Sequence, residues 1–214
     1  MMAALLAACA SGPRVPDWQI NSVAHANRYM QAHLLGNTRV AEREFTLARQ
    51  EAASTGQPAQ VARVELTRCA LQVASLDFAP CTGFAPLRED APPAEAAYAD
   101  WLTGQTNAEQ AALLPAAYRA FAVSAPGQAA PDAAALAAIE DPASRLIAAG
   151  VLMRQQRASP AIVALAAETA SAQGWRHPLL AWLGAQKRLA QESGQSEEAA
   201  RLQRRIDLVA PPSP

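Results

Sequence analysis

The three histidines are the side chains best suited to metal binding or proton transfer, and the sequence keeps them apart. They are His25, His33 and His177. On a helix, a separation of eight residues places His25 and His33 two turns apart and roughly 80° apart around the axis, so they are not expected to share a metal ion. His177 directly precedes Pro178 and is expected at the N-terminus of a helix. We therefore predict no metal site, and histidines at the surface or at the boundary of the core.

No motif of a known catalytic chemistry is present in the sequence. There is no G-x-S-x-G elbow, no H-E-x-x-H, no phosphate-binding loop and no dinucleotide-binding glycine pattern. The acidic and basic residues are spread along the chain, and the formal net charge is −1. Nucleic-acid binding would need a basic face or stripe, which this distribution does not indicate. We therefore predict a protein that is not an enzyme, takes no cofactor and does not bind nucleic acid.

The first cysteine ends an apolar segment of small residues, as the cleavage end of a secretory signal does. The stretch Leu6-Ala7-Ala8-Cys9 resembles the lipobox of bacterial lipoproteins. This resemblance implies that Cys9 is the first mature residue and carries acyl chains such as palmitate, which together hold a protein firmly at a membrane. Ala10 follows Cys9, so the Asp that keeps such proteins at the inner membrane of enteric bacteria is missing. The resemblance thus implies attachment to the outer membrane, facing the periplasm.

The remaining cysteines are an even pair, Cys69 and Cys81. In an oxidising compartment such a pair favours a disulfide, which would tie the loop around Cys81 back onto the helix expected around Cys69. The alternative is two free buried thiols. A metal site is a more distant alternative, because two cysteines make a poor set of ligands and the histidines lie far away in sequence.

Two groups of side chains are candidates for contact with a partner. Trp175 and Trp182 flank one expected turn between helices, where they either pack into the core or offer an aromatic surface. The second group lies on the polar face of the last expected helix: Arg201, Arg204 and Arg205. Because Glu197 is spaced to pair with Arg201, this group is either a solvated face or a docking patch for an acidic partner.

The elements that must position these residues are expected to be helices. The chain is rich in alanine and poor in the residues that favour strands. Segment 38–54 carries an apolar stripe of Ala41, Phe45, Ala48 and Ala52 at spacings of four, three and four. Helices are expected over residues 17–35, 38–54, 59–76, 94–103, 142–156, 160–173, 178–192 and 196–209. A further helix is expected to start at the capping-box pair Thr106 and Glu109 and to be kinked or split by Pro115.

These elements predict one domain. Residues 1–8 are interpreted as a truncated signal peptide, 9–16 as a lipidated linker, 17–210 as a single helical domain and 211–214 as a tail. A Pro-rich, irregular break is expected at 77–93. No segment approaches the roughly 20 unbroken apolar residues that a membrane-spanning helix needs.

Two stretches resemble the tetratricopeptide repeat (TPR), a helical hairpin of 34 residues. In the first, Gly36, Ala41, Phe45 and Ala48 stand at the spacing of the family. In the second, Gly194, Ala199 and Pro211 do so, with Ile206 in a place where a small residue is usual; Tyr29 and Lys187 replace the small residue of each first helix. The resemblance implies antiparallel hairpins stacked as a short α-solenoid or an irregular bundle, and binding of a protein or peptide.

Two functions follow as hypotheses. The first is an adaptor or scaffold that is anchored in the envelope by its lipid and binds another envelope protein. The second is a periplasmic carrier of a small molecule or lipid, which would need an apolar pocket between helices. An enzyme of unfamiliar type would need carboxylates gathered in one cleft, and the sequence does not place them together.

Overall fold

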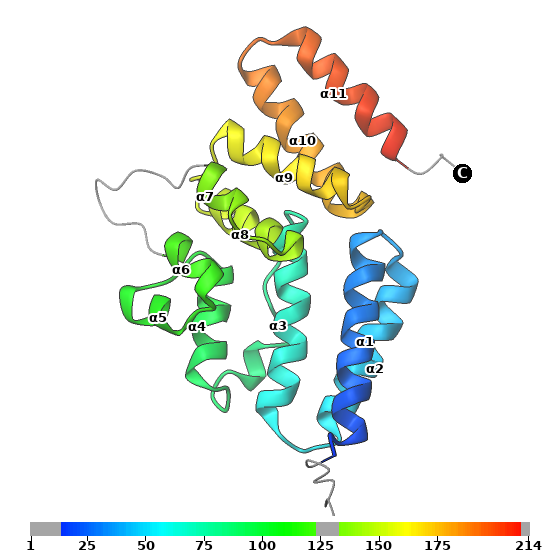
Figure 1. Ribbon diagram of the computed structural model, residues 1–214, viewed down its shortest axis with the longest axis vertical. Coiled ribbons are helices and arrows are strands. Elements are labelled where there is room, and N and C mark those ends of the chain that lie inside the picture. The colour runs from blue at the N-terminus through cyan, green and yellow to red at the C-terminus, as the bar shows by residue number, and fades with distance from the viewer. Residues whose placement is uncertain (1–13, 123–132, 211–214) are drawn as a thin grey trace, which may run out of the picture.

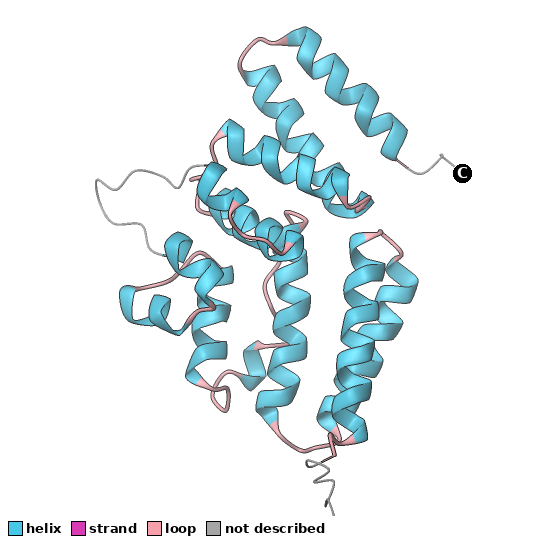
Figure 2. Ribbon diagram, in the orientation of Figure 1, coloured by secondary structure: helices cyan, strands magenta, loops and turns pink. Residues whose placement is uncertain are grey.

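The computed structural model describes residues 14–122 and 133–210, and every regular element in these two ranges is helical (Figures 1 and 2). The α-helices are α1 (Asp17–Leu34), α2 (Thr38–Ala53), α3 (Pro58–Ala74), α4 (Pro93–Leu102), α5 (Ala108–Leu113), α6 (Ala116–Ala122), α7 (Ala133–Ala137), α8 (Pro142–Arg154), α9 (Pro160–Ala172), α10 (Arg176–Glu192) and α11 (Ser196–Val209), with a 3-10 turn, η1 (Ala85–Leu87). The all-α prediction is therefore confirmed. The expected signal segment, Cys9 and the tail at 211–214 lie outside the described residues.

The helices are arranged around α3, which is buried along most of its circumference. The antiparallel hairpin of α1 and α2 lies on one side of α3, and α4, α5 and α6 lie on the other (Figure 1). Helices α7, α8 and α9 cover one end of α3, and α10 and α11 extend the molecule beyond them. The buried residues of all these groups form one hydrophobic cluster.

Short turns with a residue in the left-handed region produce the hairpins. Gly36, between α1 and α2, has a φ of 78°, and the N–H of the next residue, Asn37, donates to the carbonyl of Ala32 at 2.8 Å. Gly194, between α10 and α11, has a φ of 70°, and Gln195 donates to Ala190 in the same way at 2.8 Å. Glycine is favoured there because it has no Cβ to clash at positive φ.

Gln156, after α8, occupies this position without being glycine, with a φ of 58°. Because Gln156 is exposed, Gln156→Gly should relieve backbone strain and raise the unfolding free energy by about 1 kcal/mol, measured by urea denaturation. Gly174→Ala is the reverse control: its φ is 65° and an added Cβ would meet nothing, so it should lower stability by a similar amount. Equal stability of the three chains would contradict the backbone argument.

The capping box expected at Thr106 and Glu109 is wrong by one residue. The side chain of Asn107 accepts from the N–H of Gln110 at 2.8 Å, and the Gln110 side chain accepts from the N–H of Asn107 at 3.1 Å. Asn caps a helix at least as well as Thr. Because Asn107 and not Thr106 is the N-cap, α5 begins one residue later than expected. Pro115 does split this region, into α5 and α6. Helix α7 and the turn η1 were not expected, because both are too short to show a period.

The irregular segment between α3 and α4 is fastened to α3. Cys69 of α3 and Cys81 form a disulfide pair whose Cα atoms lie 5.7 Å apart. Gly83 lies directly on Glu65, a buried carboxylate of α3 that accepts from Arg49 Nε at 2.6 Å, and any Cβ at Gly83 would overlap that carboxylate. The loop therefore packs as part of the core although it contains little regular structure.

Replacing both Cys69 and Cys81 with alanine should lower the unfolding free energy by roughly 2–3 kcal/mol, because the bond closes a loop of 12 residues in the unfolded chain. Urea denaturation measures the loss. In a Cys9→Ala background, which leaves only these two thiols, both should resist alkylation until reductant is added. Ready alkylation of the native, unreduced protein would contradict the disulfide.

Candidate functional site

A cleft of about 750 Å³ opens on the surface between α3, α4, α6 and α8. We call it the α3–α8 cleft. Many of its apolar residues come from one stripe of α3, from α1 and α8, and from the connection between α5 and α6: Met30, Leu66, Ala70, Leu71, Leu114 and Ile147. The α3 stripe exists because residues 63, 66, 67 and 70 share one side of a helix. The volume of the α3–α8 cleft lies in the range of ligand-binding clefts.

Stacked aromatic rings lie beside the apolar residues that form the floor of the α3–α8 cleft. The ring of Trp101, which is fully buried, lies 4.3 Å from that of Tyr118, and the Tyr98 ring lies 5.9 Å from Tyr118. Both tyrosines line the cleft. Burial raises the pKa of Tyr118, and hydrogen bonds with Ser144 and Tyr98 only partly offset it; burial also raises the pKa of Tyr98. Both hydroxyls therefore stay protonated at neutral pH and can donate a hydrogen bond, but they do not act as bases.

The charged groups that line the cleft are paired. Arg63 Nε donates to Glu95 at 2.7 Å. Arg119 Nε donates to the carbonyl of Leu114 at 2.9 Å, and Asp141 accepts from the N–H of Ser144, at 2.7 Å, as the N-cap of α8. A surface with an apolar floor, two neutral hydroxyls and a balanced rim suits an uncharged, apolar binding partner.

The two tryptophans selected from the sequence lie in or near the core. Trp182 is 0% exposed, and its Nε1 donates to the carbonyl of Ala74 at 2.9 Å, which joins α10 to the end of α3. Trp182 therefore packs into the core, which is the first of the two alternatives considered for it, and it offers no surface to a partner in this conformation. Trp175, at the start of α10, is 9% exposed and offers little surface. The spacing of these residues could not show which side of the turn faces the core.

The three arginines lie on α11, as expected. Arg201 pairs with Glu198, three residues earlier, at 2.6 Å, whereas the expected partner was Glu197, four residues earlier. The side-chain hydrogen bond from Arg201 holds the pKa of Glu198 below its usual value. Arg204 is exposed and Arg205 is partly buried. A docking role for this group stays a prediction.

The structure brings together two histidines that the sequence separates by 144 residues. The rings of His33 in α1 and His177 in α10 lie 4.7 Å apart, and His177 Nδ1 lies 3.2 Å from the carbonyl oxygen of His33. Burial lowers the pKa of His33 to about 4, and the neighbouring His177 adds to this. No local pattern could have found the pair, because only the packing of α10 on α1 makes it.

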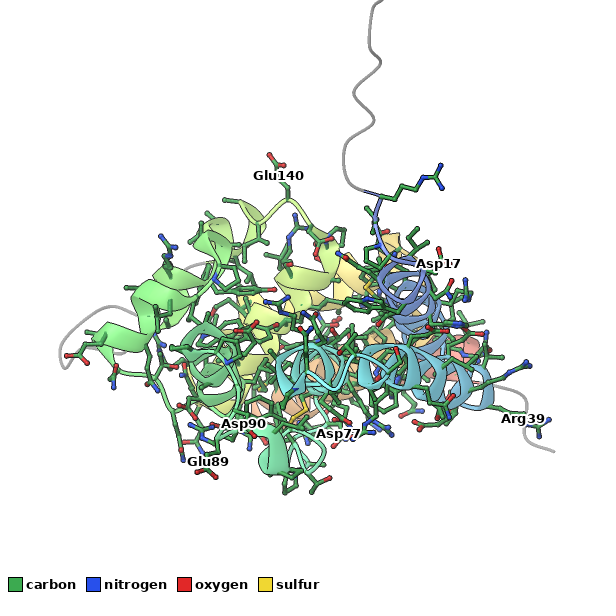
Figure 3. All side chains as sticks on the ribbon, turned by 90° about the horizontal axis from the view of Figure 1, so that it is seen from below. Asp17, Arg39, Asp77, Glu89, Asp90 and Glu140 are labelled. Carbon is green, nitrogen blue, oxygen red and sulfur yellow. A yellow bond between two sulfur atoms is a disulfide. The ribbon has the colours of Figure 1, made fainter. Side chains whose placement is uncertain are left out.

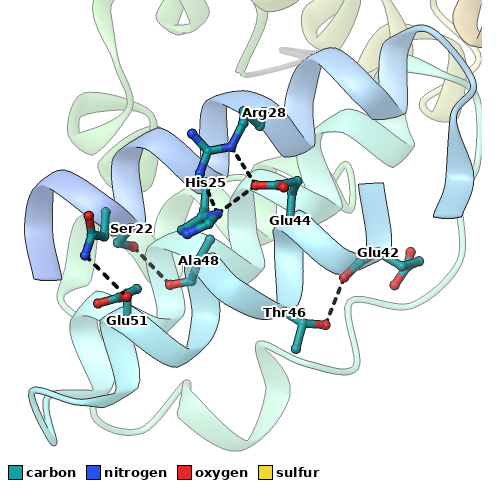
Figure 4. Close-up of polar contacts among 9 residues, drawn as sticks. Ser22, His25, Arg28, Glu42, Glu44, Thr46, Ala48 and Glu51 are labelled. Atoms are coloured by element: carbon teal, nitrogen blue, oxygen red, sulfur yellow. Dashed lines mark hydrogen bonds and ion pairs between the residues drawn. The ribbon is translucent and has the colours of Figure 1, made fainter. Parts of the chain in front are cut away.

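His25 belongs to a separate polar cluster between α1 and α2 (Figure 4). Its Nδ1 lies 2.7 Å from Glu44, which also accepts from Arg28 Nε at 2.7 Å. These two hydrogen bonds lower the pKa of Glu44. The cluster joins the two helices of the hairpin and contains no group positioned to act on a substrate.

Two further properties concern the described part of the chain. Within residues 14–122 and 133–210, no group of three or more His, Cys, Asp and Glu side chains is arranged to hold a metal ion. None of the helices in these ranges combines the length and the apolar character needed to cross a membrane.

Comparison with known proteins gives no relative on which function could rest: no family model, no curated protein and no solved structure matches the chain.

Proposed function

We propose that this protein is a lipid-anchored adaptor of a bacterial envelope, and that it binds an apolar segment of another protein in the α3–α8 cleft. Acyl chains on Cys9 would hold it at the outer membrane, facing the periplasm. The observation that carries the binding role is the cleft, an open hollow with an apolar floor and a paired rim. Grooves of this kind accept the apolar face of a helix from a partner. This function needs neither a cofactor nor a catalytic group.

Photo-crosslinking in cells tests the binding role directly. A photoreactive phenylalanine analogue is placed at Ala117, which lines the cleft on α6 and is exposed. The expected result is a defined protein adduct after irradiation and purification from membranes. Ala112, exposed on the neighbouring α5 but not lining the cleft, is the matched control. An adduct at position 117 no stronger than at position 112 would overturn the binding role of the cleft.

The anchor predicts a large change of compartment for a single substitution. Cys9→Ala removes the acylated thiol, so the protein should lose palmitate labelling and move from the membrane fraction to the soluble fraction. Quantitative fractionation and radiolabelling measure both effects. Unchanged fractionation of the Cys9→Ala protein would overturn the lipid anchor, whatever the cleft binds.

A second candidate function is the transport of a small apolar molecule. It is favoured by the hydroxyls of Tyr98, Tyr118 and Ser144 among residues that line the cleft, since a few polar groups in an apolar site fix the orientation of a small ligand. The fluorescent probe N-phenyl-1-naphthylamine should then bind to the native protein and bind more weakly to Ala117→Trp, which fills the cleft. Equal binding by native protein, Ala117→Trp and the control Ala112→Trp would exclude this function.

A further inference from the structure

The first turns of α1 and the residue that precedes its N-cap expose three branched aliphatic side chains to solvent. Val15, Ile20 and Val23 are 53%, 54% and 55% exposed. They are three of the seven large apolar residues that are exposed among the described residues, and they fall within nine positions of the chain. We call them the α1 patch. Single exposed apolar residues are ordinary, but such a local concentration indicates a contact surface.

The position of the patch in the chain identifies what it contacts. Val15 lies only six positions after Cys9, and a chain of this length reaches about 20 Å at most. If Cys9 is acylated, the patch therefore never leaves the neighbourhood of the bilayer surface. A contact between the patch and the bilayer that is weak in free solution becomes populated under such a tether, because the tether raises the effective concentration of the bilayer surface near the patch.

The polarity of this end of the molecule fits a lipid surface. The connection between α2 and α3 runs beside the start of α1 (Figure 1), and its residues 54–58, Ser-Thr-Gly-Gln-Pro, carry no charge. Asp17 is the acid within the patch, and Arg14 precedes it. Figure 3, which looks at this end, places Glu89 and Asp90 well away from Asp17, on the other side of the chain. Glu89 and Asp90 thus lie apart from the patch, whereas Asp17 and Glu51, which accepts from Asn21 at 3.4 Å, are acids close to it.

We infer that the α1 patch rests on the bilayer, with its aliphatic side chains at the boundary between headgroups and acyl chains. This inference depends on the proposed lipidation of Cys9 and adds an orientation to it. The start of α1 becomes the membrane-facing end, and α10 and α11, at the opposite end of the molecule, point into the aqueous compartment (Figure 1). The apolar face of an interfacial helix is buried at a similar shallow depth.

Quenching by brominated lipids tests the orientation. The full chain is purified from bacterial membranes and placed in vesicles of phosphatidylethanolamine and phosphatidylglycerol, with or without bromine on the acyl chains. In Val23→Trp, about half of the added tryptophan emission should be lost to the brominated lipid. Val40→Trp is the matched control, because Val40 is similarly exposed, at 50%, but lies at the other end of the α1–α2 hairpin. Its added emission should be unchanged.

The outcomes separate this inference from the anchor. Mass spectrometry first establishes whether Cys9 is acylated. An acylated, vesicle-bound protein whose position 23 is no more quenched than position 40 overturns the patch and leaves the anchor standing, and it assigns the patch to a protein partner instead. A chain with an unmodified Cys9 that does not bind vesicles overturns both. Quenching at position 23 that Ile20→Glu abolishes, with the protein still bound through its lipid, supports the inference.

Discussion

Gly150→Ala is expected to destabilise the protein by about 3 kcal/mol or more, although it adds only one methyl group. Gly150 lies in α8 where this helix crosses α3, and an ideal Cβ there would overlap the carbonyl oxygen of Val73 and lie 2.8 Å from its carbonyl carbon. The obstacle is main chain, so no side-chain rotation can relieve it. The two helices must move apart, which opens space around residues that are fully buried, such as Leu146 and Val151.

Gly184→Ala is the matched control for this prediction. Gly184 is also in the interior of a helix, α10, but a Cβ there would meet no other atom. Alanine is the better helix former, so Gly184→Ala should raise stability by about 0.5–1 kcal/mol. Thermal and urea denaturation of both variants measure the two effects. A loss at position 150 no larger than that of an ordinary surface substitution would show that α3 and α8 are not in close contact.

Mild acid should destabilise the protein through His33. Its folded-state pKa of about 4 lies below the ordinary value of 6.5, so the folded state favours the neutral ring. The stability that this provides is present above pH 6.5 and is lost as the pH falls from 6.5 toward 4. The pKa difference corresponds to a loss on the order of 3 kcal/mol. Burial is the main cause, followed by the nearby His177; Arg68 also lowers the pKa, while a hydrogen bond to Leu71 and the charge of Asp77 raise it.

The variant His33→Gln isolates this effect, because it has no proton to gain in this range. Unfolding free energies from urea denaturation at pH 7 and pH 4.5 should fall more steeply for the native chain than for His33→Gln. Carboxylates titrate in both chains, so their contribution cancels in the comparison. Parallel pH profiles would show that His33 is hydrated and titrates normally in the folded protein.

The helices could be predicted because their signals are local. Asp141 and Ser159, each followed by proline, were expected to start helices, and their side chains accept from the N–H groups of Ser144 and Ile162, at 2.7 and 3.3 Å. The stripe from Ala41 to Ala52 is buried as its spacing predicted. The missed elements are the shortest ones, in which one or two turns give no period to detect.

The candidate site could not be predicted in the same way. The α3–α8 cleft takes its lining from α1, α3, α4, α5, α6 and α8, and nothing in the local pattern of any one helix states which neighbours it will meet. The same limit applies to Trp182, whose indole N–H finds its acceptor 108 residues earlier in the chain. Interhelical packing, and not propensity, decides both features. The lipidation of Cys9 and the adaptor role stay predictions.

The contact between α1 and α10 has a consequence for the order of events during synthesis. The carbonyl of His33 meets His177, so the oldest hairpin of the chain finds one of its last neighbours only when about four-fifths of the polypeptide exists. Until then, this surface of the nascent hairpin is bare. Completion of the His33 end of α1 must therefore wait for the C-terminal part of the chain, and a ribosome-bound chain that stops before α10 should remain more open to proteases at this end of the hairpin.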